Sequence, residues 1–243
     1  MSSVFEASDR IRCVSAARGS SDDASSTRLA ILTDDKKLAT LDTDADLALR
    51  AVDSVVIPKR GTAIARFVLP SAAGGAGTPV LCVGDKWGDV ITFPDPRVSS
   101  KSRVLLGHTA CVITALESSL DGRFIFSADR EERIRVSGFP LALNIKSFCM
   151  GHTRFVSLLK VLSKPVGASY AAGQVLLSGG ADGTLRLWHW ASGTLLHTLR
   201  LLPGEVIDYG KPYEMNFRHA EEVAPLHPCP LAAATYRAQP SEG

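Results

Sequence analysis

A strand–turn–strand unit that recurs along this 243-residue chain constrains its fold more than any other feature. The clearest copy is LLSGGADGTLRLW, residues 176–188, in which two apolar stretches flank a turn at 181–183. Leu185 and Leu187 occupy alternate positions of the second stretch, as side chains of one face do along a strand, and Gly183 can take the positive φ that a tight turn needs. The stretch therefore predicts a β-hairpin.

The interval between copies identifies the repeat. A Gly-His pair occurs at 107–108 and again at 151–152, 44 residues later, and the turn aspartates Asp85 and Asp129 are also 44 residues apart. The next turn aspartate, Asp182, follows Asp129 by 53 residues, and the loop KPVGASYAAG accounts for the excess. A Gly-His pair, a turn aspartate and a strand tryptophan at intervals of about 40 to 45 residues are typical of a WD40 propeller repeat.

Four copies begin near residues 27, 62, 112 and 156, and the first of them lacks the Gly-His pair and the tryptophan. We therefore predict an all-β fold, a WD40 β-propeller that is incomplete, with about four blades of a seven-bladed ring. Residues 1–26 are expected to be a flexible N-terminal segment with a short strand at 11–16. Residues 27–202 are expected to form the blades, and 203–243 a tail or damaged blade. On this pattern the chain is expected to be a truncated form.

The hairpin at 176–188 also predicts a polar network. A histidine at the start of a blade, a strand serine, a turn aspartate and a strand tryptophan can hydrogen-bond in series, and buried polar groups need such partners. The expected members are His152, Ser178, Asp182 and Trp188. We interpret this tetrad as structural rather than catalytic.

Composition excludes several classes of protein. The net charge of +2 gives no sign of a polyelectrolyte. Five cysteines without a CxxC pair favour a reducing, intracellular compartment, and Cys82, Cys111 and Cys149 are expected in the core. No apolar run approaches the roughly 18 residues of a transmembrane helix, so no membrane partner is expected.

The chain also lacks recognisable catalytic motifs. It contains no GxGxxG, GxxxxGK[ST], GxSxG or HExxH sequence and no cluster of His and Cys at metal-ligand spacing. Asp34 and Asp35 are interpreted as turn formers, and His189 as a packing or surface residue. We therefore predict no catalytic residues, no metal and no cofactor, and a protein that is not an enzyme by itself.

The third turn, ADREERIRVS at 128–137, is unusually charged. Ile134 and Val136 should face the blade interior, which leaves Arg133 and Arg135 together on the opposite face. One interpretation is a solvated, charge-balanced hairpin. The other is a site for a partner protein, because a guanidinium group can bind a carboxylate through two parallel hydrogen bonds.

Several strings, taken in order, resemble one family. DDKKL, VGDKWGDV, LLGH, SADREERIRVS, SFCMGHTRFVS and LLSGGADGTLRLW are similar to the WD-repeat non-catalytic subunit of the tRNA (guanine-N7)-methyltransferase over roughly residues 27–200. The resemblance implies a propeller that forms a heterodimer with a separate catalytic subunit and orients it for N7-methylation of guanine in tRNA. It also implies that tRNA is contacted through the complex, and a location in the nucleus, with the cytoplasm as a second location.

The resemblance also implies site residues. The family's charged turn, ADRDEKIRVS in form, matches the third turn here, with Arg133 in place of a lysine. The residues expected to bind the partner are Arg130, Glu131, Glu132, Arg133, Arg135 and, on the neighbouring blade, Lys86. Lys59 and Arg60 are candidates for contact with RNA or partner. For these last three lysine and arginine positions, an ordinary surface cation is the alternative.

A second function class stays open. Another WD40 interaction scaffold, such as a ubiquitin-ligase substrate receptor, would show the same repeats and the same lack of catalytic groups. Purification of the protein with either a methyltransferase or a ubiquitin-ligase adaptor would separate the two hypotheses. An enzyme acting alone is disfavoured because neither a nucleophile nor a cofactor loop is recognisable.

Overall fold

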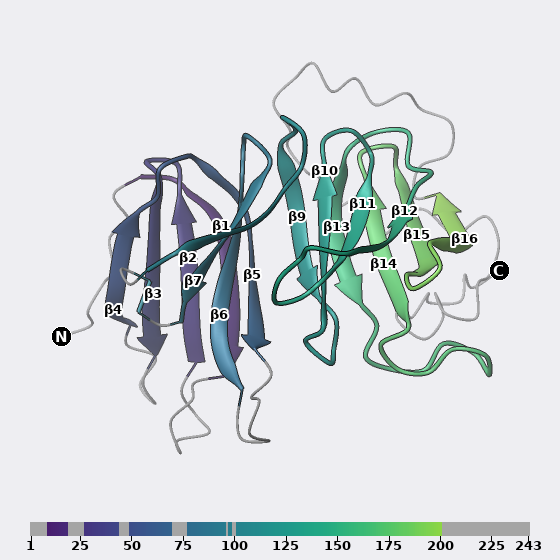
Figure 1. The fold of residues 1–243 in the computed structure, drawn as a ribbon, viewed down its shortest axis with the longest axis horizontal. Coiled ribbons are helices and arrows are strands. Elements are labelled where there is room, and N and C mark those ends of the chain that lie inside the picture. The colour runs from purple at the N-terminus through teal and green to yellow at the C-terminus, as the bar shows by residue number, and fades with distance from the viewer. Residues whose placement is uncertain are drawn as a thin grey trace, which may run out of the picture.

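The computed structural model describes residues 9–18, 27–43, 49–69, 77–95, 97–98 and 101–200. They form sixteen strands in four antiparallel sheets of four strands each, in which sequential strands are neighbours (Figure 1). The first sheet contains β1 (Ile11–Arg18), β2 (Thr27–Thr33), β3 (Lys37–Thr43) and β4 (Leu49–Val56). The second contains β5 (Gly61–Leu69), β6 (Thr78–Asp85), β7 (Asp89–Pro94) and β8 (Arg103–Gly107). The third contains β9 (Ile113–Ser118), β10 (Phe124–Asp129), β11 (Ile134–Gly138) and β12 (Ile145–Cys149), and the fourth β13 (Val156–Val161), β14 (Val175–Gly180), β15 (Thr184–His189) and β16 (Thr194–Arg200).

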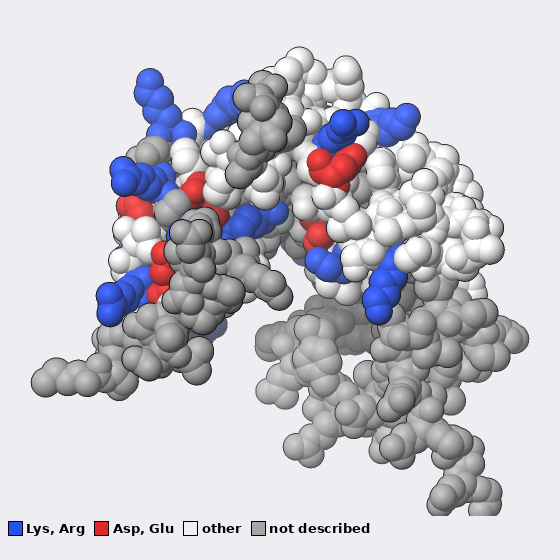
Figure 2. All heavy atoms as spheres, turned by 90° about the horizontal axis from the view of Figure 1, so that it is seen from below, with Lys and Arg blue, Asp and Glu red and all other residues white. Residues whose placement is uncertain are grey.

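The four sheets follow one another as the blades of a propeller do. The first strands of neighbouring sheets, β1 with β5, β5 with β9 and β9 with β13, contact each other and are therefore the inner strands. Seen from below, the described residues form an arch (Figure 2). The starts of the inner strands lie together, since Cys13 Sγ bonds to the carbonyl of Thr62 and Thr62 Oγ1 to that of Ile113. The turns after β2, β6, β10 and β14 lie at this end, which we call the turn end.

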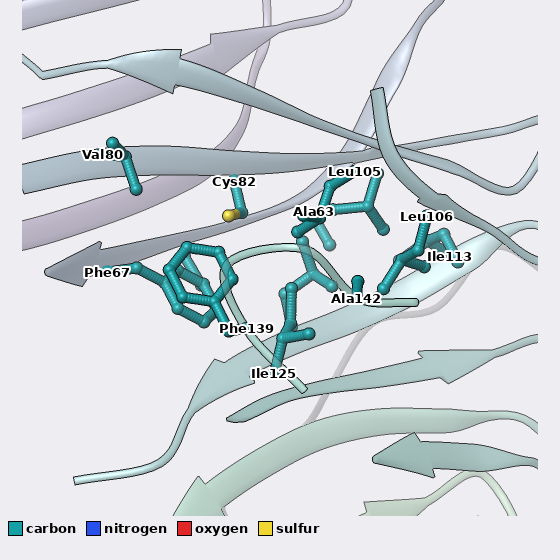
Figure 3. Close-up of a cluster of buried hydrophobic side chains, with 13 residues drawn as sticks. Ala63, Phe67, Val80, Cys82, Leu105, Leu106, Ile113, Ile125, Phe139 and Ala142 are labelled. Atoms are coloured by element: carbon teal, nitrogen blue, oxygen red, sulfur yellow. The ribbon is translucent and has the colours of Figure 1, made fainter. Parts of the chain in front are cut away.

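The hydrophobic core consists of three clusters, one at each boundary between successive sheets. At the second boundary, Phe67 and Cys82 of the second sheet face Ile125 and Phe139 of the third (Figure 3). The Phe67 and Phe139 rings are 4.9 Å apart between centroids, in the tilted arrangement that aromatic pairs prefer. The second and third sheets thus bury both faces against neighbours, and the first and fourth bury one face each among the described residues. Burial between neighbours is the reason repeats of this kind are stable only in a stack.

The predicted all-β blades are confirmed, and the structure moves one boundary. The short strand expected at 11–16 is β1, which spans Ile11–Arg18 and pairs with β2 along its length. The first sheet therefore begins before residue 27, within the segment that we predicted to be flexible. Cys82, Cys111 and Cys149 are buried, as predicted. The segment predicted as a tail, 203–243, lies outside the described residues.

Candidate partner-binding site

The predicted tetrad is present in the fourth sheet. His152 Nδ1 lies 2.9 Å from Asp182 Oδ2, and its Nε2 lies 2.8 Å from Ser178 Oγ. The indole Nε1 of Trp188 is 2.8 Å from the same Ser178 oxygen. Because the indole can only donate, the serine hydroxyl must accept from it and can donate to Nε2, so that Nδ1–H donates to the carboxylate. His152, Ser178 and Trp188 are buried, so the network holds the hairpin to the start of its own blade.

The network fixes the charge state of its members. Burial opposes ionisation of Asp182, but hydrogen bonds from Thr184, from the Thr153 amide and from His152 outweigh it and lower the pKa of Asp182 from 3.8 to about 2. Burial lowers the pKa of His152 below its usual 6.5, against the opposite effect of Asp182. A neutral histidine beside an ionised aspartate, both hydrogen-bonded, is a structural arrangement. The hydroxyl of Ser178 is buried and hydrogen-bonded to both His152 and Trp188, so it is not available to a substrate.

The third sheet builds a similar network, with its aspartate at a different position of the turn. His108 Nδ1 is 2.9 Å from Asp129 and its Nε2 is 2.8 Å from Ser127. Ser127 pairs with Arg135 as Ser178 pairs with Arg186, and the positive-φ turn residues are Glu132 and Gly183. The residue just before the positive-φ residue is Glu131 in the third sheet and Asp182 in the fourth, so Glu131, and not Asp129, corresponds to Asp182. Asp182 is therefore not equivalent to Asp129, whereas Asp85 and Asp129, 44 residues apart, are equivalent, since each lies opposite the first residue of its inner strand. Asp129 occupies the place of Gly180, where a Cβ in the fourth sheet would collide with His152.

Arg133 is satisfied inside its own turn. Its Nε lies 3.0 Å from Asp129 and its Nη2 lies 2.5 Å from Glu131. Asp129 is fully buried, and it also accepts hydrogen bonds from the amides of Glu131 and Arg133. Arg133 therefore neutralises a buried carboxylate of this chain, and it does not present a free guanidinium to a partner.

Arg135 differs from Arg133 in its partners. Its Nε donates to Ser137 Oγ at 2.8 Å and its Nη1 to the carbonyl of Gly107 at 3.1 Å, and both acceptors are neutral. Among the described residues no carboxylate lies within ion-pair distance of Arg135. Burial lowers the pKa of this arginine. The predicted alternation is confirmed: Ile134 and Val136 are buried, and the two arginines are half-buried on the other face.

Arg133 and Arg135 line a hollow of about 270 Å³ at the boundary between the second and third sheets. Apolar side chains of the third sheet share the lining, which consists of Gly107, His108, Thr109, Arg133, Arg135, Ile145, Phe148 and Met150. Phe148 pairs with Arg135 across β11 and β12, and Phe148 and Met150 are 41% and 63% exposed. We call this hollow the Arg135 groove. Such a surface, apolar with one charged group that lacks a counter-ion, is suited to a protein partner.

The sequence analysis did not single out the apolar residues of the groove, Ile145, Phe148 and Met150. A signal was present in IKSFCMGH, because Cys149 is buried while Phe148 and Met150 on either side of it are exposed. An outer strand with apolar residues on both faces indicates an exposed apolar surface. The strand pairing that brings Phe148 opposite Arg135 could not be deduced from that string alone.

The remaining predicted contacts lie at the turn end of the first and second sheets. Lys59 Nζ is 2.7 Å from Asp89 and 3.9 Å from the buried Asp85. Arg60 shares Asp34 with Arg12, at 3.0 and 2.7 Å. Lys59 and Arg60 therefore have carboxylate partners within the chain. Lys86 has none within ion-pair distance among the described residues, and its Nζ lies 5.6 Å from the centre of the Trp87 ring.

Within the described residues, the third turn presents Arg130 and Glu131 as exposed side chains and Glu132 as a half-buried one. No group of three or more His, Cys, Asp or Glu side chains there could hold a metal ion. That part of the chain also contains no helix long and apolar enough to cross a bilayer.

Comparison with known proteins agrees with the resemblance. Residues 93–208 match the family described as the tRNA methyltransferase TRM82 WD40 domain. The tRNA (guanine-N(7)-)-methyltransferase non-catalytic subunit wdr4 of Xenopus laevis is 44% identical over 130 residues, which are 53% of this chain and 31% of that protein. The subunit named wuho of Drosophila grimshawi is 33% identical over 193 residues, 75% of this chain and 47% of that protein. The chain thus spans less than half the length of these relatives.

Solved structures support the fold. A chain of an active polycomb repressive complex 2 in the basal state superimposes with a TM-score of 0.59 at 18% identity, over 73% of this chain and 36% of that chain. At this identity the likeness concerns the fold alone. The names of the relatives agree with the prediction of a protein that is not an enzyme. By fold and by sequence, the chain is a set of WD40 blades related to the WD-repeat non-catalytic subunits of tRNA (guanine-N(7)-)-methyltransferase.

Proposed function

We propose that this protein is a scaffold that binds the catalytic subunit of a tRNA (guanine-N7)-methyltransferase as a heterodimer and orients it for methylation of tRNA. The names of its relatives support the assignment, and the described residues offer a docking surface in the Arg135 groove. The proposal includes contact with tRNA through the complex and a location in the nucleus, with the cytoplasm second. Microscopy of the tagged protein would test the location.

The observation that carries the proposal is the state of Arg135. A half-buried guanidinium that bonds only to Ser137 and to a backbone carbonyl has unused capacity for a carboxylate. The apolar side chains of Phe148 and Met150 also line the groove, and Phe148 is the cross-strand neighbour of Arg135, so they would exclude water from an ion pair there. An acidic side chain of the catalytic subunit, flanked by apolar residues, fits this arrangement.

Arg135→Leu tests the proposal, and Arg133→Leu is its matched control, because both remove one arginine from the same turn. If Arg135 meets a carboxylate in a desolvated interface, its removal costs about 2–5 kcal/mol of binding free energy, or about 30- to several-thousand-fold in affinity. Arg133→Leu should weaken binding much less, since Arg133 serves Asp129. We expect N7-methylation of tRNA to fall together with complex formation only for Arg135→Leu.

The measurements are circular dichroism, titration of the catalytic subunit and a methylation assay on each variant. Equal binding and methylation by Arg135→Leu and the wild type would contradict the docking role. Loss of folding would make Arg135 a structural residue instead. Recovery of a ubiquitin-ligase adaptor, with no methyltransferase, when the protein is purified from cells would favour the alternative scaffold function.

A further inference from the structure

Trp87 stands apart from the other tryptophans of the chain. It is 58% exposed, whereas Trp188 is fully buried and Trp190 donates its Nε1–H to the carbonyl of Gly173 in a partly buried position. Nothing in the tetrad or the Arg135 groove uses Trp87. An exposed indole offers a large apolar face with a polar N–H, the combination for which tryptophan is enriched at recognition sites.

The turn holds Trp87 firmly. Its backbone amide donates to Asp85 Oδ1 at 2.8 Å, and the next amide but one, that of Asp89, donates to the same oxygen at 3.0 Å. Gly88 has φ +99° and lies against the carbonyl oxygens of His108 and Cys111, so the turn has no room to shift on that side. A platform that is rigid before binding loses little conformational entropy when a ligand stacks on it.

Two ammonium groups lie over the ring, at the distance of a cation–π contact. Lys86 Nζ is 5.6 Å and Lys59 Nζ is 6.0 Å from its centroid. Lys59 is neutralised by Asp89, with the buried Asp85 behind it, whereas Lys86 has no carboxylate within ion-pair distance among the described residues. On the first sheet, Asp34 is shared by two arginines, Arg12 and Arg60.

Among the large hydrophobic side chains recorded as exposed, Trp87 is the one tryptophan of the described residues. The combination of an exposed indole and an unpaired lysine therefore distinguishes the turn after β6.

We propose that Trp87 stacks on a nucleobase of a single-stranded or looped RNA segment while Lys86 binds a phosphate next to that base. Aromatic stacking beside a basic group is the general means by which proteins hold unpaired nucleotides. The two ammonium groups would repel a cationic ligand. An acidic peptide could satisfy Lys86 but would leave the indole face uncovered. The inference rests on the proposed function only in that the RNA would then be tRNA.

Intrinsic fluorescence tests the stacking directly. Stacking of a base quenches tryptophan emission, and the buried Trp188 and the partly buried Trp190 serve as an internal reference in the same chain. Titration of the full chain with a short single-stranded oligoribonucleotide should quench part of the emission, and Trp87→Phe should remove that part. Absence of quenching, or quenching that persists in Trp87→Phe, would overturn the proposal. Equal quenching by a polyglutamate peptide at the same ionic strength would overturn it in favour of an acidic protein partner.

Affinity measurements add a second test. Trp87→Ala should weaken binding of the oligoribonucleotide about 5- to 150-fold, the range for loss of one stacked base. Leu143→Ala, which shortens an 80% exposed leucine in the segment that joins β11 to β12, is the matched control and should change it little. Lys86→Gln should lower the slope of log affinity against log salt by about 0.7, as for one phosphate contact. An unchanged affinity in Trp87→Ala would refute the site.

The two proposals can fail separately. Quenching by RNA needs no catalytic subunit, so it can succeed even if the scaffold role is wrong. In the reconstituted heterodimer, Trp87→Ala should bind the catalytic subunit as the wild type does. Loss of that subunit in Trp87→Ala would instead identify Trp87 as part of the protein interface and would overturn the RNA site.

Discussion

Ser178→Ala removes a single hydroxyl group, yet it should lower the free energy of unfolding by more than the loss of one hydrogen bond would. Ser178 Oγ is bonded to both His152 and Trp188, each at 2.8 Å, and all three residues are buried. The substitution leaves Nε2 of the imidazole and Nε1–H of the indole without partners in a place that water does not reach. A buried polar group left unpaired costs about 1–3 kcal/mol, so we expect a loss of about 2–5 kcal/mol in the free energy of unfolding.

The third sheet supplies the matched control. Ser127 is equally buried and bonds to His108 at 2.8 Å, but the position that corresponds to Trp188 is Ser137, whose hydroxyl bonds to Arg135. Ser127→Ala therefore leaves one histidine nitrogen unpaired, at a cost of about 1–3 kcal/mol. The difference between the two variants isolates the indole hydrogen bond.

Urea unfolding, followed by circular dichroism and by the fluorescence of Trp188, measures both losses. The midpoint should fall for both variants and further for Ser178→Ala, with an unchanged slope if only the native state is affected. A loss in Ser178→Ala equal to or smaller than that in Ser127→Ala would refute the reasoning that Ser178 satisfies two buried groups.

Further outcomes concern pH, a glycine, the core and the methyl donor. Burial lowers the pKa of His152 below 6.5, so as pH falls the imidazole is protonated in the unfolded chain before it is protonated in the folded one. The free energy of unfolding should therefore drop as pH falls below about 6.5. His152→Gln should flatten that dependence in urea titrations at pH 7.5 and 5.5. The pKa of Asp182, about 2 against 3.8, predicts a second loss as pH falls from about 4 towards 2, which Asp182→Asn should remove. Gly88→Ala should lower the free energy of unfolding by more than about 1 kcal/mol, because φ is +99° and the Cβ would meet two carbonyl oxygens; a melting curve like the wild type's would contradict this. Phe67→Ala, which removes a ring packed on Phe139, should cost about 3–5 kcal/mol by urea unfolding, and a cost below 1 kcal/mol would indicate that the cluster repacks. Calorimetric titration of the chain with S-adenosylmethionine should be flat, since the sequence has no glycine-rich strand-to-helix loop, and micromolar binding would contradict the assignment.

The local parts of this fold could be predicted from the sequence alone. Alternation along a strand, a glycine at a tight turn and the recurrence of Gly-His depend on neighbouring residues, so the hairpin at 176–188 and the order of the strands were visible in the chain. The tetrad was predictable for the same reason. Ser178, Asp182 and Trp188 belong to one hairpin, the Gly-His pair marks His152 at the start of the blade, and a buried histidine, serine and tryptophan leave few other ways to pair.

The tertiary structure decided what depends on contacts between blades and on register. Asp129 and Asp182 look alike in the sequence, yet strand pairing places Asp129 at the position of Gly180, two residues before that of Asp182, and each carboxylate still lies 2.9 Å from Nδ1 of its histidine. Arg133 and Arg135 occupy the same face and appear equivalent. The structure separates them, because Arg133 reaches the buried Asp129 while Arg135 reaches the carbonyl of Gly107 in the preceding blade. The carbonyl of Gly107 is brought to Arg135 by packing between blades, across 28 residues of sequence. A one-dimensional pattern carries no record of which charge is left without a counter-ion.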